Sequence, residues 1–235
     1  MKTALVFTHE RHEGPGQFGD ILKARGFGQR IIFVPEESVS AFDAGAADLV
    51  LVMGGPMGVY EAGVYPFLEE EIIFLKKRIA LDRPTLGVCL GAQLVAAALG
   101  EEVFKGKAGQ EIGWNPLTVH KKDHPVRHLA GDKTNMFHWH GDTFELPKGT
   151  ELLASSSLYP NQVYACGKNI LALQCHPEVT PAMAADWLEE MEGEVRRSKL
   201  TPDIEELRAQ TAKNIATMNI QAKLFFEEWL EGAGL

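Results

Sequence analysis

A cysteine lies between two glycines where a predicted strand passes directly into a predicted helix. Residues 84–99 read PTLGVCLGAQLVAAAL, and Cys89 stands at the junction, flanked by Gly87 and Gly91. Small neighbours allow the sharp turn of a nucleophile elbow, in which the nucleophile projects from the strand end. Unsatisfied N–H groups at the start of the helix also favour a thiolate. The pattern predicts a nucleophilic cysteine, and the alternative interpretation is a small buried apolar side chain.

A histidine and a glutamate follow the end of a second predicted strand, in the sequence LALQCHPE over residues 171–178. His176 and Glu178 are two residues apart, and in an extended chain this spacing places both side chains on the same side. Pro177 restricts the backbone between them, so that the carboxylate can orient the imidazole. A base oriented in this way serves a cysteine nucleophile. We therefore predict Cys89, His176 and Glu178 as a catalytic triad.

A glycine-rich turn, GGPMGVYE over residues 54–61, follows another predicted strand. Its glycines let backbone N–H groups approach a substrate closely. A tetrahedral intermediate needs such donors about 2.7–3.1 Å from its oxyanion. We predict that Gly55 and Leu90, the residue after Cys89, supply them. The turn lacks the Gly-Lys-Ser/Thr ending of a phosphate-binding loop.

The remaining histidines and cysteines receive no catalytic role. His138 and His140 could complete a metal site with the His-x-Glu pair in principle, but a triad already accounts for that pair and carboxylate-rich ligand spacing is absent elsewhere. We expect no metal and no cofactor. Cys166 and Cys175 lack the elbow context of Cys89, so we interpret them as structural.

The strands that position these residues alternate with helical patterns over the first hundred residues. Strands are predicted at residues 4–7, 31–34, 49–53 and 85–88, and a crossover helix at 67–81. This alternation indicates a parallel sheet covered on both faces. Ligands of such sheets bind beyond the carboxyl ends of the strands, so chemistry is expected just after Met53 and Val88.

Two later segments differ from this pattern. Residues 111–176 contain short strands separated by turns, which we interpret as a β-rich insertion and not a second domain. We assign residues 1–198 to one domain and residues 199–235 to a helical extension, whose apolar stripe follows spacings of three or four residues. The stripe leaves two arrangements open, which are packing on the chain's own body or contact in a homodimer. The apolar stripe residues are Ile204, Leu207, Ile215, Met218, Ala222, Phe225 and Trp229.

Composition narrows the class of protein. The 235 residues are 45% hydrophobic and 23% charged, as in a compact globular chain. The net charge of -9 argues against a nucleic-acid partner, because phosphate binding needs clustered Lys and Arg. The longest apolar run and the N-terminus are too short for a membrane span or a secretion signal, so we expect no membrane partner and a cytoplasmic location.

Taken together, the three blocks resemble the class I, or triad, glutamine amidotransferases, particularly the glutaminase domain of GMP synthases. The blocks are GGP at 54–56, GVCLGAQ at 87–93 and QCHPE at 174–178, and the resemblance spans residues 1–190. It implies a flavodoxin-like three-layer α/β sandwich with a mainly parallel central sheet, here followed by a C-terminal helical tail. It also implies that the cysteine attacks the side-chain amide of glutamine, ammonia leaves, and water hydrolyses the glutamyl thioester.

The resemblance assigns roles to further residues. Gln93 matches the family position that contacts the amino-acid end of the substrate, and FHWHGD at 137–142 resembles a Ser-His-Gly-Asp loop of the same pocket. Trp139 replaces a small polar residue of the family there, and Cys175 stands where an aromatic residue is commoner. We therefore expect Trp139 to change how the α-substituents of the substrate are recognised. We expect Cys175 to change only the volume of the core. The predicted substrate-binding residues are Gly54, Gln93, Trp139, His140, Gly141 and Asp142.

Three functions fit these residues. The first is a glutaminase that delivers ammonia to a separate synthetase subunit, because the chain shows no ATP-binding signature of its own. The second is an autonomous hydrolase of γ-glutamyl peptides or amines, which Trp139 favours. The third is a non-enzymatic regulator on the same fold, which the complete set of triad residues disfavours.

Overall fold

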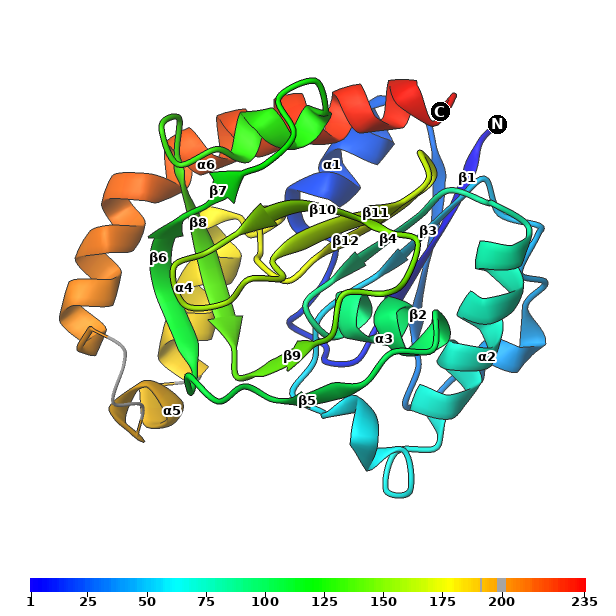
Figure 1. Cartoon of the computed structure of the whole chain (residues 1–235), viewed down its shortest axis with the longest axis horizontal. Coiled ribbons are helices and arrows are strands. Elements are labelled where there is room, and N and C mark those ends of the chain that lie inside the picture. Colours follow the sequence, from blue (N-terminus) through cyan, green and yellow to red (C-terminus); the bar gives the residue numbers. More distant parts are fainter. Residues whose placement is uncertain (191, 198–201) are drawn as a thin grey trace.

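The computed structural model describes residues 1–190, 192–197 and 202–235. Within these residues the central sheet has eight strands in the order β2-β1-β3-β4-β12-β11-β10-β7 (Figure 1). The order of the five parallel strands, with β12 taken as the fifth, is the 2-1-3-4-5 order of flavodoxin-like folds, as the sequence predicts. These parallel strands are β1 (Thr3–Thr8), β2 (Gly28–Phe33), β3 (Leu49–Val52), β4 (Thr85–Val88) and β12 (Ile170–Leu173). The antiparallel strands are β7 (Thr118–Val119), β10 (Glu151–Ser155) and β11 (Val163–Cys166).

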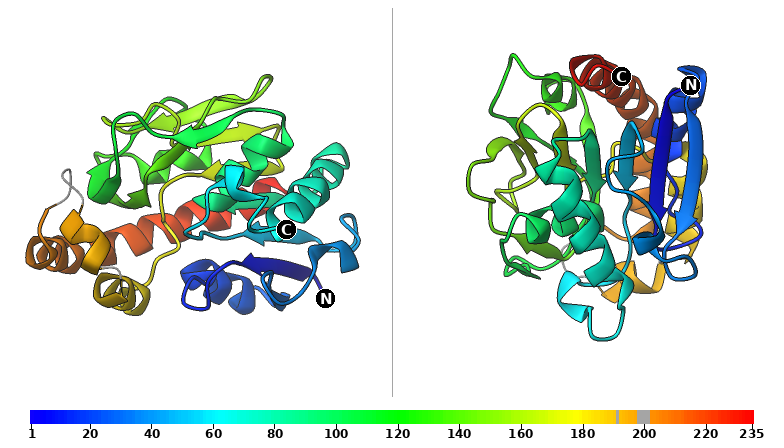
Figure 2. Two further views of the ribbon diagram at one scale, coloured as in Figure 1. Left: turned by 90° about the horizontal axis from the view of Figure 1, so that it is seen from below. Right: turned by 90° about the vertical axis from the view of Figure 1, so that its right-hand side faces the viewer.

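Helices cover both faces of this sheet. On one face lie α1 (Gly16–Ala24) and α6 (Ile204–Gly232), and on the other α2 (Phe67–Ala80) and α3 (Leu90–Ala98) (Figure 2). Side chains of a strand alternate between the faces, so Leu49 and Leu51 of β3 pack in the α1/α6 layer while Val50 and Val52 pack in the α2/α3 layer. The sheet is therefore the middle layer of a three-layer sandwich.

The strands predicted in the first hundred residues are found close to their expected bounds. The second strand begins three residues earlier than predicted, at Gly28, because it pairs in register with β1 from Thr3 onwards. It is an edge strand, and its Ile31 is 57% exposed. This exposure weakens the alternating apolar pattern by which a strand is recognised.

The interpretation of residues 111–176 as an insertion is wrong for four strands. The strands β7, β10, β11 and β12 all belong to the central sheet, and β12 pairs in parallel with β4. All four residues of β12 are apolar and buried, so this strand needs neighbours on both faces and both edges. Four other strands form two small pairs, β5 (Val103–Lys105) with β9 (Asp142–Phe144) and β6 (Glu111–Pro116) with β8 (Asn135–His140).

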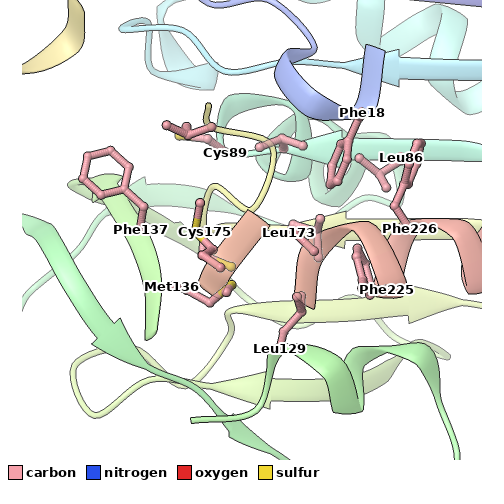
Figure 3. Packing of buried hydrophobic residues seen from close by; sticks show 14 of the residues in the cluster. Phe18, Leu86, Cys89, Leu129, Met136, Phe137, Leu173, Cys175, Phe225 and Phe226 are labelled. Carbon is pink, nitrogen blue, oxygen red and sulfur yellow. The ribbon is translucent and has the colours of Figure 1, made fainter. Parts of the chain in front are cut away.

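The C-terminal helix α6 buries its apolar stripe against the body of the same chain. Phe226 stacks on Phe18 of α1 with ring centroids 4.2 Å apart, and Figure 3 shows Phe225 and Phe226 beside Leu86 and Leu173 of the sheet. The predicted boundary between residues 198 and 199 lies outside the described residues. Among the described residues, no helix is long and apolar enough to cross a membrane. Short helices complete the chain: η1 (Val39–Ala41), η2 (Val59–Glu61), η3 (Pro125–Leu129), α4 (Pro181–Glu190) and α5 (Glu192–Arg197).

Candidate active site

Cys89 occupies a strained turn between β4 and α3. Its backbone angles are φ 53° and ψ -109°, in the positive-φ region that residues other than glycine rarely adopt. The adjacent glycines are sterically required, because a Cβ on Gly91 would lie 2.0 Å from the carbonyl oxygen of Val52. A Cβ on Gly87 would lie 2.4 Å from the carbonyl oxygen of Gly91. Glycine is therefore required at both positions for the chain to make this turn.

His176 and Glu178 meet beyond the end of β12. The Nδ1 atom of His176 is 2.8 Å from Oε1 of Glu178, and both side chains are 2% exposed. Since a carboxylate accepts, Nδ1 carries the hydrogen, and this pair fixes the orientation of the ring. Trp187 of α4 packs edge-on against the ring with centroids 5.0 Å apart. The other ring nitrogen, Nε2, makes no hydrogen bond of ordinary geometry within the described residues.

The structure brings this ring to the cysteine. A Cβ placed on Gly54 would lie 3.4 Å from Cε1 of His176 and 3.6 Å from Cβ of Cys89, so both side chains border the same point. Burial opposes a charge on His176, but the carboxylate of Glu178 and the thiolate form of Cys89 outweigh it and raise its pKa well above the ordinary value. In its thiol form, Cys89 also lies 3.7 Å from the carbonyl oxygen of Trp139. This arrangement can support a thiolate paired with an imidazolium.

Neighbouring elements hold the loop that carries His176 and Glu178. Gln17, in the first turn of α1, donates its backbone N–H to the Glu178 carbonyl oxygen at 2.9 Å and its side-chain amide to the Pro177 carbonyl oxygen at 2.6 Å. From α6, the side-chain amide of Asn219 donates to the carbonyl oxygen of Val179 at 2.8 Å. The His-Pro-Glu segment is therefore fixed from two helices that cover the same face of the sheet.

The predicted oxyanion donors lie on either side of Cys89. Gly55 lines the pocket, and within the described residues its backbone N–H has no acceptor. Leu90 is the first residue of α3, where backbone N–H groups have no partner inside the helix. Gly55 therefore borders the pocket, whereas Leu90 is fully buried and is not among the residues that line it.

His9 supports the turn that carries Gly55. Its Nδ1 is 2.8 Å from the Gly54 carbonyl oxygen and its Nε2 is 3.0 Å from Oε2 of Glu71. Because both partners can accept, this geometry suits the protonated ring, in which both nitrogens donate. Burial lowers the pKa of His9, but the charge and hydrogen bond of Glu71 outweigh it, and the pKa is raised.

A pocket of about 330 Å³ opens at the carboxyl ends of the strands, over Cys89 and His176. Glu178, Gly54 and Leu90 are not among the residues that line it, although Gly54 lies close to Cys89 and His176. The Nε2 of Gln93 donates to Gln174 at 3.1 Å, which orients the amide. The predicted residues that line the pocket are Gly55, Cys89, Gln93, Trp139, His140, Gly141, Asp142 and His176.

Residues 22–190 match the glutamine amidotransferase class-I family. That match covers more than half of the chain and includes the three predicted triad residues. The chain belongs to this family. Two solved structures share its fold over nearly the whole length: a glutamine amidotransferase of Thermotoga maritima (TM-score 0.88, 29% identity, 98% of each chain), and a glutamine amidotransferase of Methylobacillus flagellatus (TM-score 0.89, 26% identity, 99% of this chain and 95% of that one).

Relatives in this family differ in their names. A glutamine amidotransferase-like protein of Salmonella typhimurium is 26% identical over 94% of both chains. Gamma-glutamyl peptidase 4 of Arabidopsis thaliana is 32% identical over 44% of this chain and 43% of the peptidase. The GMP synthase of Prochlorococcus marinus is 36% identical over 55% of this chain, but this match covers only 24% of the synthase. Membership of the family thus leaves the substrate to be argued from the site.

Several pocket residues were missed from the sequence, and Glu13 is the most informative of them. Glu13 lies in the loop after β1, and a Cβ on Gly54 would lie 2.5 Å from its carboxylate. Burial raises its pKa, partly opposed by the nearby charge of His176. The rule that directed attention to the ends of β3 and β4 applies equally to β1 and would have found this residue. The other missed lining residues that carry polar groups are Tyr60, Glu61, Lys105, Gln110 and Trp187.

The structure does not bring His138 into the triad. His138 and His140 lie on one side of β8 and meet Glu111 of the paired strand β6, while Trp139 between them faces Phe137 and Trp187. The sequence analysis missed Glu111, because its encounter with both histidines depends on the register of two strands more than twenty residues apart. His140 also lines the pocket, so this second group of titratable residues lies directly behind the pocket wall.

Proposed function

We propose that this protein hydrolyses the γ-amide bond of glutamine through a thioester on Cys89. The observation that carries the proposal is the strained turn of Cys89 beside the buried His176–Glu178 pair, at the carboxyl ends of the parallel strands. This is the edge of a doubly wound sheet where ligands bind. Cys89 is the proposed nucleophile, His176 the acid and base, and Glu178 the residue that orients His176.

The reaction has two halves that return the enzyme to its starting state. The thiolate of Cys89 attacks the amide carbon, and the N–H groups of Gly55 and Leu90 stabilise the negative charge that develops on the oxygen. His176 gives its Nε2 proton to the departing nitrogen, so ammonia leaves and a γ-glutamyl thioester remains. Water then attacks the thioester, His176 accepts its proton, and glutamate leaves as the thiolate is restored.

The remaining predicted residues have proposed roles in substrate binding. Gln93 is oriented by Gln174 and borders the pocket, where it can contact the amino-acid end of glutamine. Trp139 and Gly141 line the pocket and shape it near the thiol, and Gly54 lies beside Cys89 and His176. Asp142 accepts a hydrogen bond from Tyr60, whose pKa burial and this hydrogen bond raise to about 12. The His140 nitrogens are engaged elsewhere, so its proposed role is to form the wall.

A second candidate is hydrolysis of γ-glutamyl peptides or γ-glutamyl amines, and the charge of the pocket favours it. Three acidic side chains line the pocket, those of Glu13, Glu61 and Asp142, against the basic side chains of Lys105 and His176. Such a lining attracts a cationic substituent, such as the free ammonium of a γ-glutamyl diamine. The similarity to a plant γ-glutamyl peptidase agrees with this candidate. An ammonia-accepting synthetase subunit belongs to the first candidate, and the similarity to GMP synthases agrees with such a partner.

The deciding experiment measures glutamate release from glutamine and from a panel of γ-glutamyl dipeptides and γ-glutamyl amines. We expect turnover that Cys89→Ser lowers by at least about 10⁴-fold. Cys166→Ser is the matched control, since this half-buried thiol lies at the end of β11, outside the pocket. Release from glutamine supports the first candidate and release confined to the panel supports the second. Turnover that survives in Cys89→Ser contradicts both, and a biological effect that survives Cys89→Ala would support the regulator.

A further inference from the structure

A cluster of two histidines and one glutamate lies behind the pocket wall and is not used by the proposed reaction. Glu111, His138 and His140 are all buried, and one ligand atom from each lies within 4.8 Å of the others. Nδ1 of His138 is 3.6 Å and Nε2 of His140 is 3.1 Å from the same carboxylate oxygen, Oε2 of Glu111. Three potential ligand atoms therefore converge on one buried point.

The hydrogen bonds of His140 determine which of its nitrogens faces that point. Its Nδ1 is 3.0 Å from the carbonyl oxygen of Asp142, which can only accept, so Nδ1 carries a hydrogen. In the neutral ring, Nε2 then holds a lone pair, and that lone pair faces the carboxylate of Glu111. Two electron-rich atoms 3.1 Å apart in a buried site need a cation between them.

A proton on Nε2 of His140 would satisfy only part of this arrangement. It would place an N–H against the side-chain amide of Gln162, whose Nε2 lies 3.3 Å away. It would also leave His138 without a partner. His138 makes no hydrogen bond of ordinary geometry among the described residues, although the Asn115 main chain lies near its ring. A nitrogen of the His138 ring is therefore available as a ligand atom.

We propose that Glu111, His138 and His140 bind a divalent transition-metal ion of the zinc type. Ligand atoms around a tetrahedral zinc ion are about 3.3 Å apart when the metal–ligand bonds have their usual lengths, and the two distances to Glu111 Oε2 bracket this value. Two nitrogens and one carboxylate are a ligand set that zinc accepts. The side-chain amide of Gln162 donates to Oε2 of Glu111 at 2.7 Å and so holds that ligand, and a water molecule completes the four ligands.

The surroundings resemble the outer shell of a metal site. The ring of His140 is held through Nδ1–H by a main-chain carbonyl, as is usual for a histidine ligand. The carboxylate of Glu111 accepts a hydrogen bond from Ser156 at 3.0 Å. A metal here ties β6 to β8 and fixes the loop from His140 to Asp142, which lines the pocket. Its proposed role is therefore structural support of the substrate-binding wall, independent of the reaction that the pocket performs.

The test is made on full-length Cys89→Ser protein, so that the nucleophile cannot bind the metal. After chelation and addition of Zn²⁺, we expect about one zinc ion per chain to remain after gel filtration. Co²⁺ in its place should give the visible absorption of a four-coordinate site without a sulfur charge-transfer band. Glu111→Gln and His138→Gln should each weaken zinc binding by at least about tenfold. His120→Gln, which alters an exposed histidine, should leave binding unchanged.

Two results would overturn the proposal. One is a Cys89→Ser protein that retains no zinc, and the other is undiminished binding in both folded ligand variants, as judged by circular dichroism. If either ligand variant fails to fold, the Co²⁺ spectrum of the Cys89→Ser protein decides alone. A spectrum with a sulfur charge-transfer band, or with no visible band, counts against the site.

Discussion

Two groups of buried histidine and glutamate residues lie on opposite sides of the pocket wall, and their geometries differ. In the proposed triad, Glu178 holds Nδ1 of His176, and among the described residues Nε2 makes no hydrogen bond of ordinary geometry. In the second group, His138 and His140 direct nitrogens to a single oxygen of Glu111. The same residue types can thus transfer a proton where one histidine nitrogen has no partner. They can bind a cation where several ligand atoms converge. The direction in which the histidine nitrogens point, and not the type of residue, separates the proposed catalytic role from the proposed metal-binding role.

The largest expected effect is on the triad side of this comparison. Glu178→Gln removes the charge that favours the imidazolium of His176, so kcat/KM should fall by about 10²–10⁴-fold. The free energy of unfolding should change far less than the activity, because the amide keeps the shape of the side chain. Steady-state glutamate release and urea unfolding measure both quantities. Glu189→Gln, an exposed change on α4, is the control, and a loss of less than tenfold for Glu178→Gln would remove the distinction between the two groups.

The next effect falls on stability at the second group. In metal-free protein, Glu111→Gln leaves two buried imidazoles without their charged partner, and the free energy of unfolding should fall by about 3 kcal/mol. The activity of the remaining folded protein should change by less than about tenfold, or roughly 1.4 kcal/mol in barrier. Chemical unfolding measures the change in stability, and kinetics at a single temperature measure the change in activity. Glu151→Gln, at an exposed ion pair with Lys121, should cost under about 1 kcal/mol. A rate loss as large as that of Glu178→Gln would place Glu111 in the reaction.

The smallest effect concerns a carboxylate that belongs to neither group. The folded chain holds the proton of Glu13 to a higher pH than the unfolded chain, since burial raises its pKa from 4.5. The folded state therefore binds more protons, and this residue makes stability fall as pH rises from 4.5 through the raised pKa. At pH 7, Glu13→Gln should stabilise the chain by about 1 kcal/mol, or roughly 2–4 °C in Tm.

Below pH 4.5 the advantage of Glu13→Gln should disappear, because Glu13 is then protonated in both states. Thermal unfolding at pH 4 and pH 7 measures this difference. Glu10→Gln, on the same loop but outside the pocket lining, should show no such dependence on pH. A Glu13→Gln protein that is less stable than the parent at pH 7 would show that the carboxylate is paired and not merely buried.

Local sequence was sufficient to predict four of the five parallel strands and the elbow that carries Cys89. The elbow is encoded within five residues, because Gly87, Cys89 and Gly91 determine the turn by their own sterics. The strands β3 and β4 are short, wholly buried and apolar except for Thr85, and such a run is typical of a buried parallel strand. The proposed role of Cys89 rests on the same short segment of sequence.

Contacts between distant residues could not be predicted in this way. Glu111 faces His140 only because β6 and β8 pair in one register, and a shift of one residue would turn Glu111 to the opposite face. The placement of β12 between β4 and β11 is likewise a property of the whole sheet. The residues of the helical stripe were correctly identified, but their contact with Phe18 was not determined by spacing alone.

The position of α6 has a consequence for how the protein is made. Asn219 holds the backbone beyond Glu178, and Phe226 packs on the helix whose first turn holds Pro177 and Glu178. Both residues follow Glu178 in the chain and leave the ribosome after it. A nascent chain that has reached α5 already contains Cys89, His176 and Glu178 but lacks the support of α6 for their loop. We expect a reactive thiolate to mature only when α6 has been synthesised and has docked, so that unfinished chains are kept inert during translation.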